Sequence, residues 1–81
     1  MLNSMTGAVR LRLSDILKER NLRQIDFAAQ TGLSENTISD LTNNAVRQIR
    51  LDTLARICDA LAIKPGDILI YTPESEKSEA T

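Results

Sequence analysis

Histidine is absent from this 81-residue chain, and cysteine occurs once, at Cys58. A single cysteine excludes an internal disulfide, which suits a reducing compartment. Without histidine a Cys–His nucleophile pair is excluded, and one cysteine alone does not make a structural zinc site. The acidic residues have no histidine or metal context, so we expect no enzyme, no metal site and no cofactor.

Long apolar runs are missing as well. No segment approaches the roughly 20 apolar residues that a membrane-spanning helix needs, and residues 1–7 lack the basic and apolar regions of a signal peptide. We therefore expect a cytoplasmic protein with no membrane partner. The length fits one small domain, whose modest core makes help from a partner chain plausible.

The chain also has no excess of positive charge. Its 10 Lys and Arg face 11 Asp and Glu, for a formal net charge of −1. DNA-binding domains are often basic, so the total charge permits DNA binding but does not indicate it. Three of the acidic residues, Glu74, Glu76 and Glu79, belong to residues 74–81, which we expect to be a disordered acidic tail.

Apolar periodicity predicts an all-α fold, a compact bundle of about five short helices over residues 9–73, behind a flexible segment of residues 1–8. Ser14 would cap the first helix, and Pro65 would open the fifth. An apolar stripe marks the fourth helix, in the order Leu51, Leu54, Ile57, Cys58 and Leu61. The first four expected helices cover about residues 15–20, 23–31, 35–43 and 51–61.

Two further segments predict a small terminal β-ribbon. Residues 9–13 alternate apolar and basic side chains with period two, as in a half-buried strand. Residues 68–71 either continue the fifth helix or form a strand, and we favour a helical turn followed by a strand from about Ile70 that pairs with residues 9–13. The four apolar side chains of residues 68–71 are either all buried within one subunit or partly free for a second copy.

The most informative segment, residues 22–41, joins two short helices through a tight turn, as in a helix-turn-helix unit. The small Ala28 lets the helices approach closely, Gly32 tolerates positive φ, and Ser34 is a strong N-cap for the third helix. One side of the third helix is apolar, and the other is polar, which suits a helix in a DNA major groove. The polar side consists of Glu35, Asn36, Ser39, Asp40 and Asn43.

A series of residues at fixed spacings carries a family resemblance: Gln24, Ala28, Gly32, Leu33-Ser34, Thr37-Ile38-Ser39 and Leu41, then residues 51–61 and 65–69. In this series the chain resembles the Cro and phage-repressor helix-turn-helix family, also called the xenobiotic-response-element family, over about residues 9–73. The resemblance implies a sequence-specific transcriptional regulator with double-stranded DNA as its partner. We expect a repressor that binds a palindromic operator as a homodimer, with its third helix in the major groove.

The resemblance also implies roles for individual residues. Gln24 would touch a phosphate and brace the third helix, with Arg23 beside it. Asn43 and the loop after it would contact the DNA backbone, so Arg47 and Arg50 in that loop are expected to contact phosphates. The complete expected DNA-binding set is Arg23, Gln24, Ser34, Glu35, Asn36, Thr37, Ser39, Asp40, Asn43, Arg47 and Arg50.

In two respects the chain departs from the family pattern. Asn44 replaces the usual glycine after the third helix. Glu35 and Asp40, which with Asn36 occupy the positions that face base edges, stand where many members carry Arg, Lys or Gln. Because carboxylates repel phosphates, this acidic face favours a rival hypothesis, in which the fold serves as an antitoxin or an adaptor with a protein partner.

Overall fold

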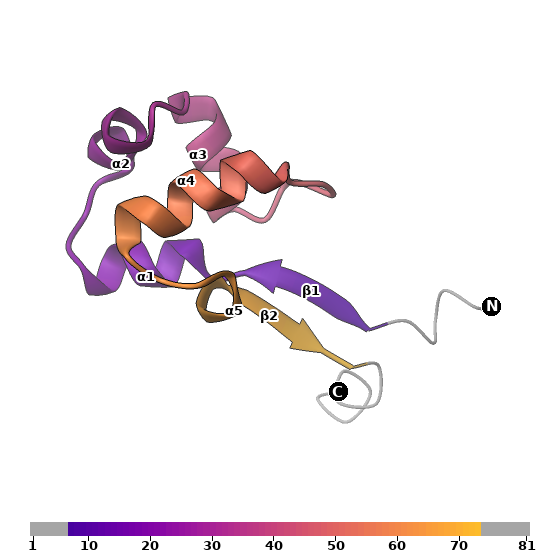
Figure 1. Ribbon diagram of the computed structural model, residues 1–81. Helices are drawn as coiled ribbons and strands as arrows, with labels where there is room; N and C mark the ends of the chain where they lie inside the picture. Colours follow the sequence, from indigo (N-terminus) through magenta and orange to yellow (C-terminus); the bar gives the residue numbers. More distant parts are fainter. Residues whose placement is uncertain (1–6, 74–81) are drawn as a thin grey trace.

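The computed structural model describes residues 7–73, which form five helices and one two-stranded antiparallel sheet. In Figure 1, α4 crosses between α2 and α3 on one side and α1, α5 and the strands on the other. The predicted fold class is confirmed, including the terminal ribbon. The expected acidic tail and most of the expected flexible start lie outside the described residues. In chain order the elements are β1 (Ala8–Leu11), α1 (Leu13–Glu19), α2 (Gln24–Thr31), α3 (Glu35–Thr42), α4 (Leu51–Leu61), α5 (Pro65–Ile68) and β2 (Leu69–Thr72).

The start of α1 corrects one prediction. The helix begins at Leu13, so Ser14 is inside it and does not cap it, and no other side chain caps it. Leu13, Ile16 and Leu17 follow helical spacing and are all buried. This helical stripe outweighs the alternation that continues to residue 13 in the sequence, and β1 therefore ends at Leu11.

The fourth helix has the predicted bounds, but its apolar stripe is shorter than predicted. Leu54 and Ile57 are buried with the rest of the stripe, whereas Leu51 is 82% exposed. Leu51 is the first residue of α4, and side chains of a helix lean towards its N-terminus. The Leu51 side chain therefore extends past the end of the helix, beyond the core.

The ribbon pairs as predicted, with Val9 opposite Tyr71 and Leu11 opposite Leu69. Its second strand begins at Leu69, directly after the single turn of α5. Ile68 is fully buried, but Tyr71 is 66% exposed, so the alternative that all four apolar side chains are buried in one subunit is wrong. Val9 is 65% exposed, which leaves a cross-strand apolar pair open to solvent.

Every helix contributes to a single core. Within residues 7–73 no buried side-chain nitrogen or oxygen lacks a hydrogen-bond partner. Cys58 is buried in this core, as expected of a small hydrophobe, and its burial raises the pKa of the thiol. No helix in the described part of the chain is long and apolar enough to cross a membrane. The largest fully buried side chains are Leu13, Phe27, Ile38, Ile57, Leu61 and Ile68.

Candidate nucleic-acid interface

The turn between α2 and α3 is held by Gly32 and Thr31. Gly32 has a φ of 76°, in the left-handed region that residues with a Cβ rarely adopt. The buried hydroxyl of Thr31 donates to the carbonyl oxygen of Phe27 (2.9 Å) and accepts from the backbone N–H of Leu33 (3.2 Å). These contacts fix the direction in which α3 leaves α2.

Ser34 caps α3 as predicted. Its hydroxyl oxygen accepts a hydrogen bond from the backbone N–H of Thr37 at 3.1 Å, and its O–H donates to the Thr37 hydroxyl at 2.9 Å. The cap satisfies one of the free N–H groups in the first helical turn. Both hydroxyls thus lie together at the N-terminal end of α3.

Gln24 connects the beginning of α2 to the end of α3. Its side-chain Nε2 donates to the hydroxyl of Thr42 at 3.3 Å, which is the bracing contact that the family resemblance implied. The Thr42 hydroxyl in turn donates to the carbonyl oxygen of Ser39 at 2.9 Å. No pattern in the sequence indicated a role for Thr42, because its partner Gln24 lies on a different helix.

The exposed side of α3 is polar throughout. Glu35, Asn36, Asp40 and Asn43 are exposed, and Ser39 is half-buried among them. At about 100° per residue, Ser39, Asn36 and Asn43 lie towards the middle of this exposed arc, and Glu35 and Asp40 lie at its edges. The amide of Asn43 donates to the hydroxyl of Ser39 at 3.4 Å. The centre of the face therefore offers neutral donors and acceptors, flanked by carboxylates.

Two of the three arginines expected at the interface are held by aspartates. Nε of Arg23 lies 2.9 Å from Oδ2 of Asp26, and Nε of Arg50 lies 3.0 Å from Oδ1 of Asp52. The hydrogen bond to Asp26 raises the pKa of Arg23, and the hydrogen bond from Arg50 lowers the pKa of Asp52. Arg47 is exposed and has no ion-pair partner among residues 7–73.

The loop that carries Arg47 and Arg50 is anchored to β1 by the side chain of Asn44. Its Oδ1 accepts from the backbone N–H of Leu11 at 2.7 Å, and its Nδ2 donates to the Leu11 carbonyl oxygen at 2.9 Å. Asn44 has a φ of 55°, in the region where the family usually places glycine. In the sequence Asn44 stood out only as a substitute for that glycine, and no local pattern indicated the anchor.

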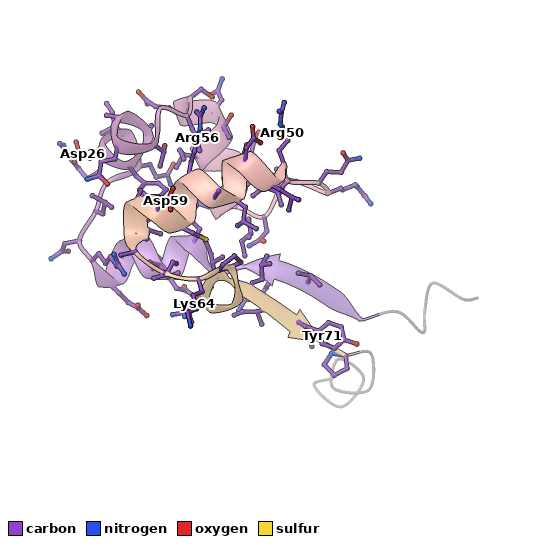
Figure 2. The ribbon with its side chains drawn as sticks, in the orientation of Figure 1. Asp26, Arg50, Arg56, Asp59, Lys64 and Tyr71 are labelled. Carbon is purple, nitrogen blue, oxygen red and sulfur yellow. The ribbon has the colours of Figure 1, made fainter. Side chains whose placement is uncertain are left out.

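The candidate residues lie on the α2, α3 and α4 side of the molecule. Figure 2 shows Asp26 and Arg50 on the side that carries α2 and α3, whereas Lys64 and Tyr71 lie on the side of the ribbon. Asp26 follows Arg23 by three residues, a helical spacing that could have identified the pair from the sequence. In the described part of the chain no group of three or more His, Cys, Asp or Glu could hold a metal ion.

Two short helices joined at a left-handed glycine, the second capped by serine and polar on its free side, define a helix-turn-helix domain of the DNA-binding class. Residues 12–74 match the family model of the Cro/C1-type helix-turn-helix DNA-binding domain. The chain belongs to this family, which confirms the resemblance found in the sequence. The family consists of DNA-binding transcriptional regulators and not of enzymes.

Individual relatives agree with this assignment. The chain is 32% identical over 69 residues to YozG of Bacillus subtilis (strain 168), an uncharacterised HTH-type transcriptional regulator, and the match covers 85% of this chain and 82% of YozG. A crystal structure of a candidate DNA-binding protein from Bacteroides fragilis is similar with a TM-score of 0.69 and 30% identity, over 78% of this chain and 100% of that one. The transcriptional regulator VanUg is similar with a TM-score of 0.67 and 26% identity, over 84% of this chain and 89% of that one.

Proposed function

We propose that this chain is a cytoplasmic repressor that binds a palindromic operator in double-stranded DNA as a homodimer, with α3 in the major groove. The observation that carries the proposal is the exposed face of α3, where amide and hydroxyl groups lie between two carboxylates. Base edges in the major groove present donors and acceptors that such groups can distinguish.

In this proposal the middle of α3 reads base edges. The amide of Asn36 pairs with adenine N6 and N7, and Ser39 contacts the neighbouring base. The carboxylates of Glu35 and Asp40 accept from cytosine N4, because an ionised carboxylate is a hydrogen-bond acceptor only. Ser34 and Thr37 lie at the N-terminal end of α3, where their hydroxyls donate hydrogen bonds to the nearest phosphate.

The residues around α3 contact the DNA backbone. Gln24 stays bonded to Thr42 through its nitrogen, which leaves its oxygen free and α3 fixed relative to the start of α2. Asn43 and Arg47 after α3 contact phosphates, and Arg23 and Arg50 lie where they reach phosphates when their aspartate partners release them. Such contacts set the register of the protein on the duplex but carry no sequence information.

Base reading is tested with Asn36→Ala on an operator selected from a random duplex library by the purified protein. The operator affinity should fall by about 1–3 kcal/mol, the worth of a good bidentate base contact. The melting temperature should stay nearly unchanged, because the Asn36 side chain is exposed. Gln30→Ala, an exposed amide on α2, is the matched control. A large fall in melting temperature with intact affinity would contradict the placement of this face.

Phosphate contact is tested with Arg47→Ala. This variant should weaken binding to the operator and to random duplex about equally, and it should reduce the salt slope by about one unit for each bound subunit. Unchanged affinity and slope would remove Arg47 from the interface.

Two observations support the homodimer: an exposed apolar pair on the ribbon, and the short stretch of DNA that one recognition helix can read. Val9 and Tyr71 form an exposed apolar pair on the side away from α2 and α3, where a second copy can pack without covering the DNA-binding face. A single recognition helix reads only a few base pairs, and dimers of this motif bind half-sites about 34–36 Å apart.

Sedimentation at micromolar concentration tests the dimer. Tyr71→Lys should be a folded monomer that loses affinity for the palindrome, because the introduced charge would be buried in the dimer contact. Leu51→Lys changes an exposed apolar side chain of α4 that is not part of the ribbon, and this variant should stay dimeric. A wild-type monomer that binds one half-site as tightly as the palindrome would contradict the dimer.

The acidic edges of α3 support a second candidate, in which the same face binds a basic protein partner as an antitoxin or adaptor does. Glu35 and Asp40 are both exposed, and the face has no basic residue on α3 itself. Binding to random duplex that weakens as the salt concentration rises supports the DNA function. No binding to any duplex at low salt supports the protein partner.

A further inference from the structure

Two helices of the proposed DNA-binding side begin with the same arrangement. Arg23 is the N-cap residue of α2, and Arg50 is the N-cap residue of α4. Each guanidinium is bound through two nitrogens by an aspartate in the first turn of its own helix: at 2.9 and 3.4 Å by Asp26, and at 3.0 and 3.2 Å by Asp52. Each aspartate thus occupies the fork of the guanidinium with both carboxylate oxygens.

The fork that binds a carboxylate also binds a phosphate. Arginine makes paired hydrogen bonds to both groups with the same planar geometry, so one fork cannot be fully bonded to both at once. A DNA phosphate that approaches Arg23 or Arg50 must displace the aspartate or accept a weaker contact. It also meets the negative charge of that aspartate.

The charges of the whole side reinforce this competition. The three arginines of the proposed interface are Arg23, Arg47 and Arg50. They are outnumbered by the four carboxylates of α2, α3 and the first turn of α4, which are Asp26, Glu35, Asp40 and Asp52. Of these three arginines, only Arg47 has no ion pair within residues 7–73. Sequence-independent binding of DNA comes almost entirely from phosphate contacts of this kind.

We propose that Asp26 and Asp52 are specificity-determining residues, each of which holds the preceding arginine away from the DNA backbone, so that duplexes of arbitrary sequence bind weakly and base contacts by α3 decide where the protein binds. This inference rests on the proposed DNA-binding function. Its consequence is a gain of function, because removal of either carboxylate should strengthen binding to random duplex.

An aspartate in a first helical turn also has an ordinary role, since it stabilises the positive end of the helix. The chain contains a matched example of that role alone. Asp15 lies in the first turn of α1, at the third helical position as Asp26 does in α2, and it is exposed. It has no ion-pair partner among the described residues. Asp15→Asn therefore removes the same charge at the same helical position without releasing an arginine.

The experiment measures binding of the full chain to a fluorescein-labelled random duplex by anisotropy, with salt varied between about 50 and 200 mM. Exposed ion pairs change equilibrium constants by a factor of about 1.5 to 5, so Asp26→Asn and Asp52→Asn should each raise the affinity about threefold and the double variant about tenfold. The salt slope of the double variant should be steeper than that of wild type. Asp15→Asn should change the affinity by less than about 1.5-fold.

A second cycle tests whether the gain passes through the arginine. In an Arg23→Gln background, Asp26→Asn should give no larger gain than Asp15→Asn gives in wild type, because no fork remains to be released. Gains from Asp26→Asn and Asp52→Asn that match the Asp15→Asn control, or that persist without Arg23, would overturn the inference while leaving DNA binding intact. Failure of wild type and all variants to bind any duplex at low salt would overturn the proposed function and this inference together.

Discussion

Asn44 offers the sharpest test of how this small fold holds the loop between α3 and α4. Its amide bonds to both backbone groups of Leu11, at 2.7 and 2.9 Å, and its own backbone has a φ of 55°. The side chain thus takes the place of a neighbouring strand at the edge of β1, and the backbone turns the chain away from α3. Two substitutions separate these contributions.

Asn44→Gly removes the two hydrogen bonds but keeps a residue that tolerates positive φ. At about 0.5–1.5 kcal/mol for each net hydrogen bond, the loss should be about 1–3 kcal/mol. Asn44→Ala removes the same bonds and adds the cost of a left-handed backbone, about 1–2 kcal/mol for a residue with a Cβ. Alanine at this position should therefore be less stable than glycine.

Urea unfolding followed by circular dichroism measures both values. A loss of 1 kcal/mol also lowers the melting temperature by about 4–8 °C in a domain of this size. Asn44→Asp adds a pH test, because its ionised carboxylate cannot donate to the Leu11 carbonyl and the folded state should therefore raise its pKa. The lost stability should return as the pH falls through this raised value, and the return should be complete below the unfolded pKa of about 4. If Asn44→Gly is as stable as wild type, the anchor contributes nothing and the reasoning fails.

Three further predictions concern the core and the turn. Gly32→Ala should destabilise by about 1–2 kcal/mol through backbone strain alone, because the nearest atom to an added Cβ is Nη1 of Arg56 at 3.7 Å; equal stability in urea would show that the turn relaxes. Leu54→Ala should lower the free energy of unfolding by about 2–5 kcal/mol, and Leu51→Ala should lower it by less than about 0.5 kcal/mol. Equal losses would contradict the exposure of Leu51. Burial raises the pKa of the Cys58 thiol in the folded state. The contribution of the neutral thiol to the free energy of unfolding is therefore complete below its unfolded pKa of about 8.5, and it is lost as the pH rises through the pKa of the folded state. The difference in unfolding free energy between wild type and Cys58→Ala should therefore narrow above that pH, and a constant difference would argue against the burial effect.

The features that sequence analysis predicted correctly are those whose causes are local. The bounds of α4, the glycine turn and the Ser34 cap each depend on residues within a few positions of one another. Alternation of side chains likewise predicted the first strand of the ribbon, whereas residues 68–71 left a helix and a strand open and their pairing with residues 9–13 was the favoured of the two. Local propensity and tertiary packing agree at these places, so the pattern alone is sufficient.

The missed features depend on partners distant in the sequence or on competition between two local patterns. The anchor from Asn44 to Leu11 spans 33 positions, and no periodicity connects the two residues. Leu13 satisfies both the strand alternation and the helical stripe, and only its packing with Ile16 decides between them. Leu51 has the correct spacing for the stripe but lies beyond the end of the core.

The salt dependence of operator binding follows from the same ion pairs and is the last prediction. Each arginine that neutralises a phosphate contributes about 0.9 to the slope of log affinity against log salt. A dimer in which all three interface arginines of each subunit contact phosphates would have a slope of about −5, whereas a dimer in which only Arg47 is free would have a slope of about −2. Asp26 and Asp52 hold the other two arginines. We therefore expect a slope of about −2 for wild type and about −5 for the Asp26→Asn, Asp52→Asn double variant. A wild-type slope of about −5 on the selected operator would contradict this prediction. It would mean that DNA displaces both aspartates completely, and that these acidic residues do not limit the number of arginine–phosphate contacts.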